Sequence, residues 1–450
     1  MNLLNAVRAF CHQLEEGSTC WIAYSGGLDS QVLLSLCHQL RAETKNHFRV
    51  LHINHGISAN ATSWADHCRK TCASYGMDYI ERSIQLDLQA GDSLEAVARA
   101  KRYAVFAEYL KEGDMLLTAH HQDDQAETVL LQLLRGSGMK GLAAMPAIKS
   151  FACGYHARPL LTFSRADIFA YATEKNLRWV DDESNDDTRL TRNFIRHEIL
   201  SRLTSRWPSA SAAISRSAAH CAESQTLLEH FSQNLQCAGS REHTLSVAKL
   251  LALNPLQQKL VLRSWIQQLN FPLPDTRKMN TILRDVLPAA CDRQPKVEWG
   301  GVMLRRYRDD LYLLPVRAEI DTQAEYAWNL QTELELPQWG VLKVCGSGLR
   351  SDIKNVTVRF RQGGEVLELP GRGRHTLKNL FQEWGVPPWE RACLPLIYAK
   401  EKLIAIPGYF LHADYAEEER GRSKQHHLIP TFSSPSPLPS HAASHETTAV

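Results

Sequence analysis

Short apolar segments alternate with amphipathic, helix-like segments through the first 134 residues of this 450-residue chain. Four apolar segments are rich in β-forming side chains and have the length of buried strands: residues 20–24, 48–53, 79–86 and 115–119. Apolar residues recur at helical spacing in residues 32–40, 64–75, 93–110 and 123–134. Strands separated by helices pair in parallel, so the alternation predicts an α/β fold with a doubly wound, mostly parallel, Rossmann-like sheet.

The rest of the chain predicts further domains. Residues 1–207 hold the predicted sheet, and residues 208–321 are mainly helical and end in short β-rich runs. Residues 322–420 have the mixed pattern of a small α/β domain. Residues 421–450 are rich in Ser, Pro and His, with too little apolar content to pack, so we predict that they are disordered.

Composition restricts the location and partners of the chain. Its formal net charge is only +2, so a nucleic-acid-binding surface would have to be local. The 11 cysteines include no C-x-x-C pair, which argues against a zinc ribbon or a disulfide framework and suits a reducing compartment. No signal peptide or membrane-spanning run is present in the sequence. These features predict a cytoplasmic protein without a membrane partner.

A glycine-containing hexapeptide joins the first predicted strand to the helix that follows. Its residues are Ser25, Gly26, Gly27, Leu28, Asp29 and Ser30. Glycines let backbone N–H groups approach phosphate oxygens closely, and the start of a helix attracts anions. Asp29 would repel a phosphate unless magnesium lies between them. A plain glycine turn is the alternative, but the flanking strand and helix favour a phosphate loop, and no Gly-Lys-Ser/Thr follows as in a Walker A loop.

A second polar cluster follows the fourth predicted strand, in residues 120–128. Asp123 and Glu127 are one helical turn apart and share a face, next to Asp124 and Thr128. Grouped acids beside a phosphate site suit magnesium or an ammonium group. The alternative is an acidic first turn that the helix dipole favours anyway. Zinc is disfavoured, because no third and fourth ligand follow the two histidines at a suitable spacing.

Both segments resemble known motifs. The hexapeptide resembles the S-G-G-x-D-S loop of the ATP-pyrophosphatase (PP-loop) superfamily, and His120–Thr128 closely resembles the H-H-x-D-D-Q-x-E-T signature of the tRNA(Ile)-lysidine synthetase family. Further strings similar to that family are Asn54-His55-Gly56, Gly136-Ser137-Gly138 before Gly141-Leu142, Arg158-Pro159-Leu160-Leu161, Asp182-Glu183-Ser184-Asn185 and Arg192-Asn193-Phe194-Ile195-Arg196. The resemblance runs nearly continuously from about residue 20 to 205. One departure is Thr188-Arg189-Leu190, where the family leads us to expect an aromatic residue.

The resemblance implies a ligase that uses ATP and Mg²⁺. The enzyme would join free L-lysine to C2 of the wobble cytidine in the CAU anticodon of tRNA(Ile), through an adenylated tRNA intermediate. The product, lysidine, would change codon reading from AUG to AUA. ATP would be cleaved to AMP and pyrophosphate. A homodimer is left open as an assembly.

The residues and the resemblance together predict the active site. ATP-binding residues are Ser25, Gly26, Gly27, Leu28, Asp29, Ser30 and His55. Catalytic residues are Asp29, Arg102, His120, Asp123, Asp124 and Glu127, with Asp29 and Asp123 as magnesium ligands. Arg102 enters because it matches the family's pattern on the long helix, together with Arg99. His120, His121 or Asp123 could accept the proton of the lysine amine, and the sequence does not choose among them.

Two basic segments are candidates for tRNA contact. Arg192 and Arg196 belong to an arginine series that follows the acidic run 181–187, so pairing within the chain and phosphate contact are both open. Residues 350–380 include seven Lys or Arg residues and only three Asp or Glu residues. This segment resembles the tRNA-binding C-terminal domain of longer bacterial lysidine synthetases. The predicted tRNA-binding residues are Arg192, Arg196, Arg359, Arg372, Arg374 and Lys378.

Two rival functions remain. A tRNA thiolase of the same superfamily would need a persulfide or iron–sulfur cysteine set, and the missing C-x-x-C speaks against it. A non-catalytic tRNA- or nucleotide-binding protein is disfavoured by the intact acids Asp29, Asp123, Asp124 and Glu127.

Overall fold

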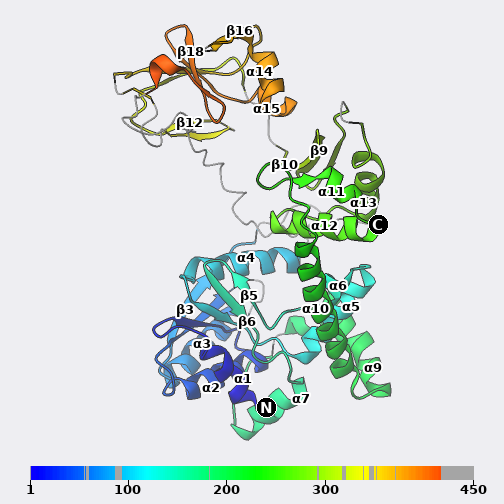
Figure 1. The fold of residues 1–450 in the computed structure, drawn as a ribbon. Helices are drawn as coiled ribbons and strands as arrows, with labels where there is room; N and C mark the ends of the chain where they lie inside the picture. The colour runs from blue at the N-terminus through cyan, green and yellow to red at the C-terminus, as the bar shows by residue number, and fades with distance from the viewer. Residues whose placement is uncertain are drawn as a thin grey trace. The chain divides into compact units, whose positions relative to one another are not determined.

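A computed structural model of the chain describes most of its residues (Figure 1). The described residues are 2–54, 56, 60–86, 94–181, 183–290, 293–316, 321–337, 339–343, 349–350, 352–369 and 371–416. The predicted disordered tail, 421–450, lies outside them. Contacts divide the chain into two compact units, with Phe231 the last residue of the first and Ser232 the first of the second. This division is coarser than the predicted three-domain organisation, which stays a prediction.

The first unit contains a six-stranded sheet in the order β3-β2-β1-β4-β6-β5. Its strands are β1 (Thr19–Ala23), β2 (His47–Asn54), β3 (Asp78–Ser83), β4 (Met115–Leu117), β5 (Ile148–Phe151) and β6 (Gly154–Ala157). All neighbours pair in parallel except β5, which is antiparallel to β6. The predicted mostly parallel sheet is therefore confirmed.

Two details of the strands differ from the sequence-based expectation. The third strand ends at Ser83 and does not continue to residue 86, because its partner β2 ends at Asn54 and offers no further ladder. The β5–β6 hairpin is an addition to the expected strands, and each of its strands is only four residues long. Gly154 belongs there, because a Cβ at this position would lie 2.2 Å from the carbonyl oxygen of Asp114.

Alternating strand residues bury the two faces of the sheet against different helices. Cys20 and Ile22 point into a core shared with α1 (Leu3–Cys11), α2 (Leu28–Leu40), α3 (Ala61–Ser74) and α7 (Arg165–Glu174). Trp21 and Leu116 point to the opposite face. There they pack with Phe106 of α4 (Leu94–Tyr109) and with Leu110, the residue that follows this helix. Helices on both faces make the sheet doubly wound.

Further helices complete the first unit. They are α5 (Gln122–Leu134), α6 (Met139–Leu142), η1 (Glu183–Asp186), α8 (Thr191–Phe194), the π-helix η2 (Ile195–Leu200), α9 (Ser201–Arg206) and the start of α10 (Ala210–Asn234).

The second unit begins with helices α11 (Val247–Leu251), α12 (Pro255–Gln268) and α13 (Thr276–Thr281), which η3 (Ile282–Val286) extends. They pack on a four-stranded antiparallel sheet of β7 (Leu245–Ser246), β8 (Lys296–Trp299), β9 (Val302–Tyr307) and β10 (Asp310–Pro315). Within the described chain, no helix has the length and apolarity needed to cross a membrane.

The C-terminal part of this unit is rich in strands. A five-stranded antiparallel sheet joins β11 (Glu325–Trp328), β14 (Val356–Arg359), β17 (Leu396–Ala399), β18 (Lys402–Ile406) and β19 (Phe410–Leu411). Two hairpins, β12 (Leu334–Leu336) with β13 (Gly340–Leu342) and β15 (Val366–Leu369) with β16 (Gly373–Thr376), accompany α14 (Leu377–Glu383), α15 (Pro388–Arg391) and η4 (Ala413–Tyr415). Arg241 links this part to the preceding one, because it bonds Glu390 at 3.1 Å.

Candidate active site

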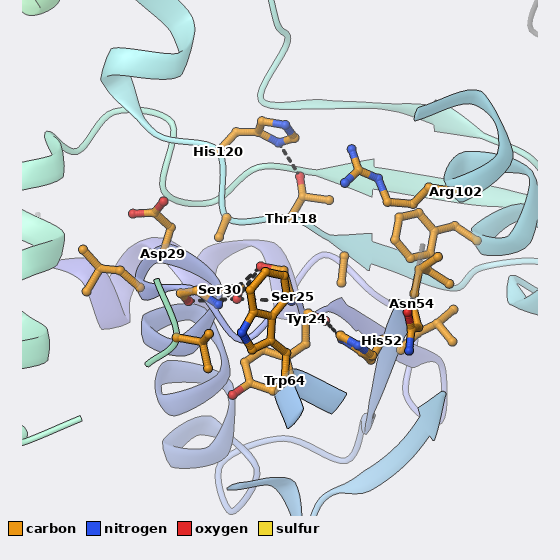
Figure 2. Close-up of a pocket in the computed structure, with 18 of the residues that line it drawn as sticks. Tyr24, Ser25, Asp29, Ser30, His52, Asn54, Trp64, Arg102, Thr118 and His120 are labelled. Atoms are coloured by element: carbon orange, nitrogen blue, oxygen red, sulfur yellow. Dashed lines mark hydrogen bonds between the residues drawn. The ribbon is translucent and has the colours of Figure 1, made fainter. Parts of the chain in front are cut away.

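A cavity of about 520 Å³ opens at the carboxyl ends of β1, β2 and β4 (Figure 2). The segments that follow these three strands meet there, and this is where doubly wound sheets usually bind their ligands. The predicted site residues that line it are Ser25, Gly27, Leu28, Asp29, Ser30, Arg102, His120, Asp124 and Arg196. Gly26, Asp123, Glu127 and Arg192 are not among the lining residues. His55 lies outside the described residues.

The glycine hexapeptide forms a turn between β1 and α2. Gly26 has φ +86°, and a Cβ there would lie 2.8 Å from the Cys68 sulfur, so this position requires glycine. Gly27 is the N-cap of α2 and gives no side-chain cap, which leaves the first N–H groups of the helix available. The hydroxyls of Ser25 and Ser30 lie 3.1 Å apart at the same end. The turn therefore gathers amide and hydroxyl donors that suit an anion.

Asp29 stands in the first turn of α2, beside these donors. Burial raises the pKa of its carboxyl above the ordinary value, and Asp124 adds to the rise while His121 opposes it. Its Oδ1 atom is buried and has no hydrogen-bond partner among the described residues. A buried carboxylate oxygen without a donor is costly, and a cation would satisfy it.

Magnesium fits this position only as part of a complex with phosphate. No set of three His, Cys, Asp or Glu side chains in the described chain is arranged to hold a metal ion. Magnesium usually takes one or two carboxylates together with phosphate oxygens and water, so the orphaned Asp29 oxygen is sufficient for such a site. Asp123, the second predicted ligand, accepts a hydrogen bond from the Arg165 backbone N–H at 3.2 Å.

The His121 ring is buried at the centre of three carboxylates. Its Nδ1 accepts the Asp123 backbone N–H at 3.2 Å, and this hydrogen bond caps α5. The Nε2 atom of the ring lies 3.5 Å from an Asp124 oxygen and 3.7 Å from an Asp29 oxygen. His121 therefore links the start of α5 to the phosphate loop.

Two arginines and two acids form a largely buried quartet, of which Asp124 and Arg196 line the cavity. Glu127 is fully buried, and its two oxygens accept from Arg192 Nε at 2.7 Å and Arg196 Nε at 2.6 Å. Asp124 Oδ1 accepts from the same two arginines at 3.0 and 3.1 Å. Burial alone would raise the pKa of Asp124, but His121 and Arg192 hold it well below its usual range. The quartet is balanced in charge and fixes α5 to α8 and η2.

Pairing within the chain, one of the two roles left open for the arginine series, does occur. The partner acids of Arg192 and Arg196 that the structure shows, Asp124 and Glu127, are on α5. From that run, Asp187 pairs with the exposed Arg189 at 2.8 Å. Whether Arg192 or Arg196 also touches tRNA stays a prediction.

His120 reaches the cavity from the end of β4. Its Nδ1 is 2.8 Å from the Thr118 hydroxyl, and Arg102 extends toward the same side of the cavity (Figure 2). Burial is the main cause that lowers the pKa of His120 to about 3, and the charges of Arg158 and Arg192 add to it while Asp124 opposes. His120 is therefore neutral near pH 7. Arg99 does not line the cavity and packs over the Tyr103 ring, 5.0 Å from its centroid.

Several lining residues carry no signal in the sequence. Apolar and aromatic groups from β1, β2 and α3 form one wall, namely Ala23, Tyr24, Leu51, Ile53 and Trp64. Arg165, Val180 and Asp181 approach from segments far along the chain. The Val180 backbone N–H donates to the Gly26 carbonyl at 2.9 Å, which places this segment against the phosphate loop. No spacing rule connects residue 180 to residue 26, so only the strings shared with the family mark the region.

The C-terminal basic residues divide into paired and unpaired groups. Arg359 pairs with Glu325 at 2.9 Å and with Glu401 at 3.2 Å, and Arg372 pairs with Glu383 at 2.8 Å. Arg374 and Lys378 are exposed on β16 and α14, and neither forms an ion pair with a residue that the structure describes. The three partner acids lie outside residues 350–380, so the positive excess of that window is partly balanced by the rest of the domain.

Comparisons with known proteins cover nearly the whole chain. Residues 2–203 match a family described as PP-loop domain, residues 245–312 match the TilS substrate binding domain, and residues 356–426 match the TilS substrate C-terminal domain. A solved structure of the U34-tRNA thiolase NcsA from Methanococcus maripaludis, with its [4Fe-4S] cluster, is a distant neighbour. It is 20% identical with a TM-score of 0.41, over 49% of this chain and 78% of that one.

Curated relatives are much closer in sequence. The tRNA(Ile)-lysidine synthase of Coxiella burnetii is 44% identical over 407 residues, which is 89% of this chain and 91% of that protein. The tRNA(Ile)-lysidine synthase of Methylococcus capsulatus is 42% identical and covers 90% of this chain and 94% of its own length. With this identity along both chains, and with three family models matched in order, the protein belongs to the tRNA(Ile)-lysidine synthase family.

Proposed function

We propose that this protein ligates lysine to C2 of the wobble cytidine of tRNA(Ile) with a CAU anticodon, in a reaction driven by ATP. The observation that carries the proposal is the cavity at the sheet edge, which combines a phosphate loop, the Asp29 carboxylate and His120 in a chain that matches the family over about nine tenths of its length. The product is lysidine, which pairs with AUA and not with AUG.

ATP is proposed to lie along the cavity with its phosphates on the hexapeptide. The N-terminus of α2 and the Ser25 hydroxyl supply donors for the pyrophosphate portion, and the Ser30 hydroxyl, which donates to the Gly27 carbonyl at 3.0 Å, would have to turn to join them. The apolar wall that contains Ile53 and Trp64 suits the adenine ring. Asp29 would hold Mg²⁺ against the phosphates, and the ion would neutralise charge on the departing pyrophosphate.

The reaction takes two steps. In the first, the cytosine O2 forms a bond to the α-phosphorus, the α–β phosphoanhydride bond breaks, and its electron pair leaves with pyrophosphate. In the second, the ε-amine of lysine bonds to C2, the C2–O2 bond breaks, AMP leaves, and the amine gives up a proton. The protein contributes mainly alignment and charge stabilisation. His121 is the weakest candidate to take the proton, because both of its ring nitrogens are engaged.

The C-terminal domain is proposed to hold the tRNA through its phosphates. The exposed Arg374 and Lys378 are the best placed of the six predicted contacts, because no acid within the described residues competes for them. Arg359 and Arg372 would first have to share or leave their glutamate partners. Arg192 and Arg196 keep part of their side chains accessible, at 22% and 25%, and could contact phosphate only at that edge.

The decisive test supplies purified protein with ATP, Mg²⁺, radiolabelled lysine and tRNA(Ile) bearing CAU. Label should appear in the anticodon fragment after ribonuclease digestion, and should resist mild alkali. A matched tRNA with the wobble cytidine replaced by guanosine should take no label. Label released from the 3′ end by alkali, or no label at all, overturns the proposal.

The rival functions give different results in the same preparation. A thiolase would incorporate sulfur and not lysine. A non-catalytic binding protein would bind tRNA without releasing AMP or pyrophosphate. An ATP–pyrophosphate exchange assay with and without tRNA separates these cases.

A further inference from the structure

A chain of hydrogen bonds runs from a buried arginine to the histidine that faces the cavity. Arg158 donates from one terminal nitrogen to His156 Nδ1 at 3.2 Å and from the other to the Pro146 carbonyl at 2.7 Å. His156 Nε2 lies 2.9 Å from the Thr118 hydroxyl. The same hydroxyl lies 2.8 Å from His120 Nδ1. The hydrogen bonds therefore connect the guanidinium through His156 to Thr118 and His120, and the last two residues line the cavity.

The chemistry of the arginine fixes the direction of every bond in this chain. A guanidinium can only donate, so His156 Nδ1 must be an unprotonated acceptor and its Nε2 must carry the hydrogen. His156 Nε2–H then donates to the Thr118 oxygen. The Thr118 hydroxyl has no other partner among the described residues, so its own hydrogen points at His120 Nδ1. His120 Nδ1 is therefore an acceptor, and its hydrogen is on Nε2.

The surroundings keep the His156 and His120 rings neutral, and the hydrogen-bond directions given above require neutral rings. His156 is fully buried, and Arg158 is only 3% exposed. Burial and the Arg158 charge lower the pKa of His156 to about 2. Arg158 forms no salt bridge within the described chain, so its positive charge stays directed at the two rings.

We infer that Arg158, His156 and Thr118 are positioning residues that lock His120 in the Nε2–H tautomer, so that His120 donates a hydrogen bond to an anionic oxygen of the reacting nucleotide. This inference rests on the proposed adenylation chemistry and sharpens it. A locked donor stabilises negative charge that develops on phosphate oxygens without having to reorient. It also removes His120 from the candidates for the base in the second step and leaves Asp123 as the remaining one of the three.

The tautomer can be observed without any reaction. Protein labelled with ¹⁵N in its histidine rings is examined by two-bond ¹H–¹⁵N correlation between pH 8 and pH 6, and the signals of His120 and His156 are assigned with His120→Gln and His156→Gln. Both rings should show a protonated-type Nε2 and an unprotonated-type Nδ1 throughout. A protonated Nδ1, or averaging between tautomers, in His120 overturns the inference whatever the enzyme makes.

Substitution of Thr118 tests the positioning role in the reaction. Thr118→Val keeps the shape and removes the hydroxyl, so His120 should show mixed tautomers and kcat for AMP formation should fall about 10- to 100-fold with little change in the KM for ATP. Thr118→Ser restores the hydroxyl and should restore both the tautomer and most of the rate. A Val variant with the wild-type ring signals and rate overturns the inference. If wild-type protein forms no lysidine but shows the locked tautomer, the proposed function fails and the hydrogen-bond chain stands.

Discussion

Arg192 and Arg196 of the first unit differ in environment from Arg374 and Lys378 of the C-terminal part, although the sequence predicts tRNA contact for both pairs. Arg192 and Arg196 are held at 2.6–3.1 Å by Asp124 and the fully buried Glu127. Arg374 and Lys378 are exposed and make no ion pair with the described residues. The first group carries charge into the protein interior, where it is balanced, and the second presents charge to solvent.

This difference separates what a substitution should do in each region. A buried charge that loses its partner remains desolvated, so the cost is mainly one of folding. An exposed charge can be removed with little effect on folding, and its loss lowers only the affinity for a charged ligand. Stability and tRNA affinity are therefore the two measurements that distinguish the regions.

Asp29→Asn should have the largest effect, and only on chemistry. The substitution keeps the side-chain size and removes the charge proposed to hold magnesium at the phosphates. We expect the adenylation rate to fall about 1,000-fold, as when a main electrostatic contact of a reacting phosphate is lost. Pyrophosphate release in single turnover measures the rate. Binding of tRNA and its salt dependence should be unchanged, and a near-normal rate would contradict the metal assignment.

Glu127→Gln should mainly destabilise the first unit. The substitution leaves two partly buried arginines with one carboxylate, so the free energy of unfolding should fall by about 3 kcal/mol. Urea unfolding followed by circular dichroism measures it. Glu198→Gln is the matched control, because its pair with Arg202 is exposed and should be worth less than about 0.5 kcal/mol. Equal stability of the two variants would show that the quartet is not a structural element.

The buried histidines should make the first unit sensitive to acid. The pKa of His156 is lowered in the folded state. Below about pH 6.5, His156 therefore binds a proton in the unfolded chain but stays neutral in the folded chain. Stability is thus greatest above that pH and falls as the pH drops, by at most about 1.4 kcal/mol per pH unit for this residue. His156→Gln should make the dependence shallower between pH 6 and pH 4.5. His220→Gln, at an exposed position, should leave it unchanged, and equal slopes in all three proteins would refute the assignment.

Arg374→Ala and Lys378→Ala should produce the smallest changes, and only in tRNA binding. Each should weaken all tRNAs alike and lower the slope of log affinity against log salt by somewhat under one unit. Arg372→Ala should change the slope less, because it also releases the Glu383 carboxylate from its ion pair. Filter binding from 50 to 200 mM salt measures the slopes. Unchanged melting temperatures together with unchanged slopes would exclude this surface as the tRNA platform.

The sequence alone determined the fold class, the phosphate loop and the family. Alternating strand and helix patterns are local and strong, so they predict the parallel sheet and its four main strands without any knowledge of tertiary contacts. Gly26 and Ser30 lie four residues apart, which made the loop recognisable from its own geometry. The match to relatives along about nine tenths of the chain confirms the family that the His120–Thr128 segment indicated.

Only the tertiary structure decided which charges face each other. Arg196 and Glu127 are 69 residues apart, and Thr118 and His156 are 38 apart, so no periodicity could pair them. The short β5–β6 hairpin carries His156 beside Thr118, and that neighbourhood sets the direction of hydrogen bonding at His120. Electrostatic roles depend on burial and on partners within a few ångströms, and these are properties of the packed chain and not of the residue type.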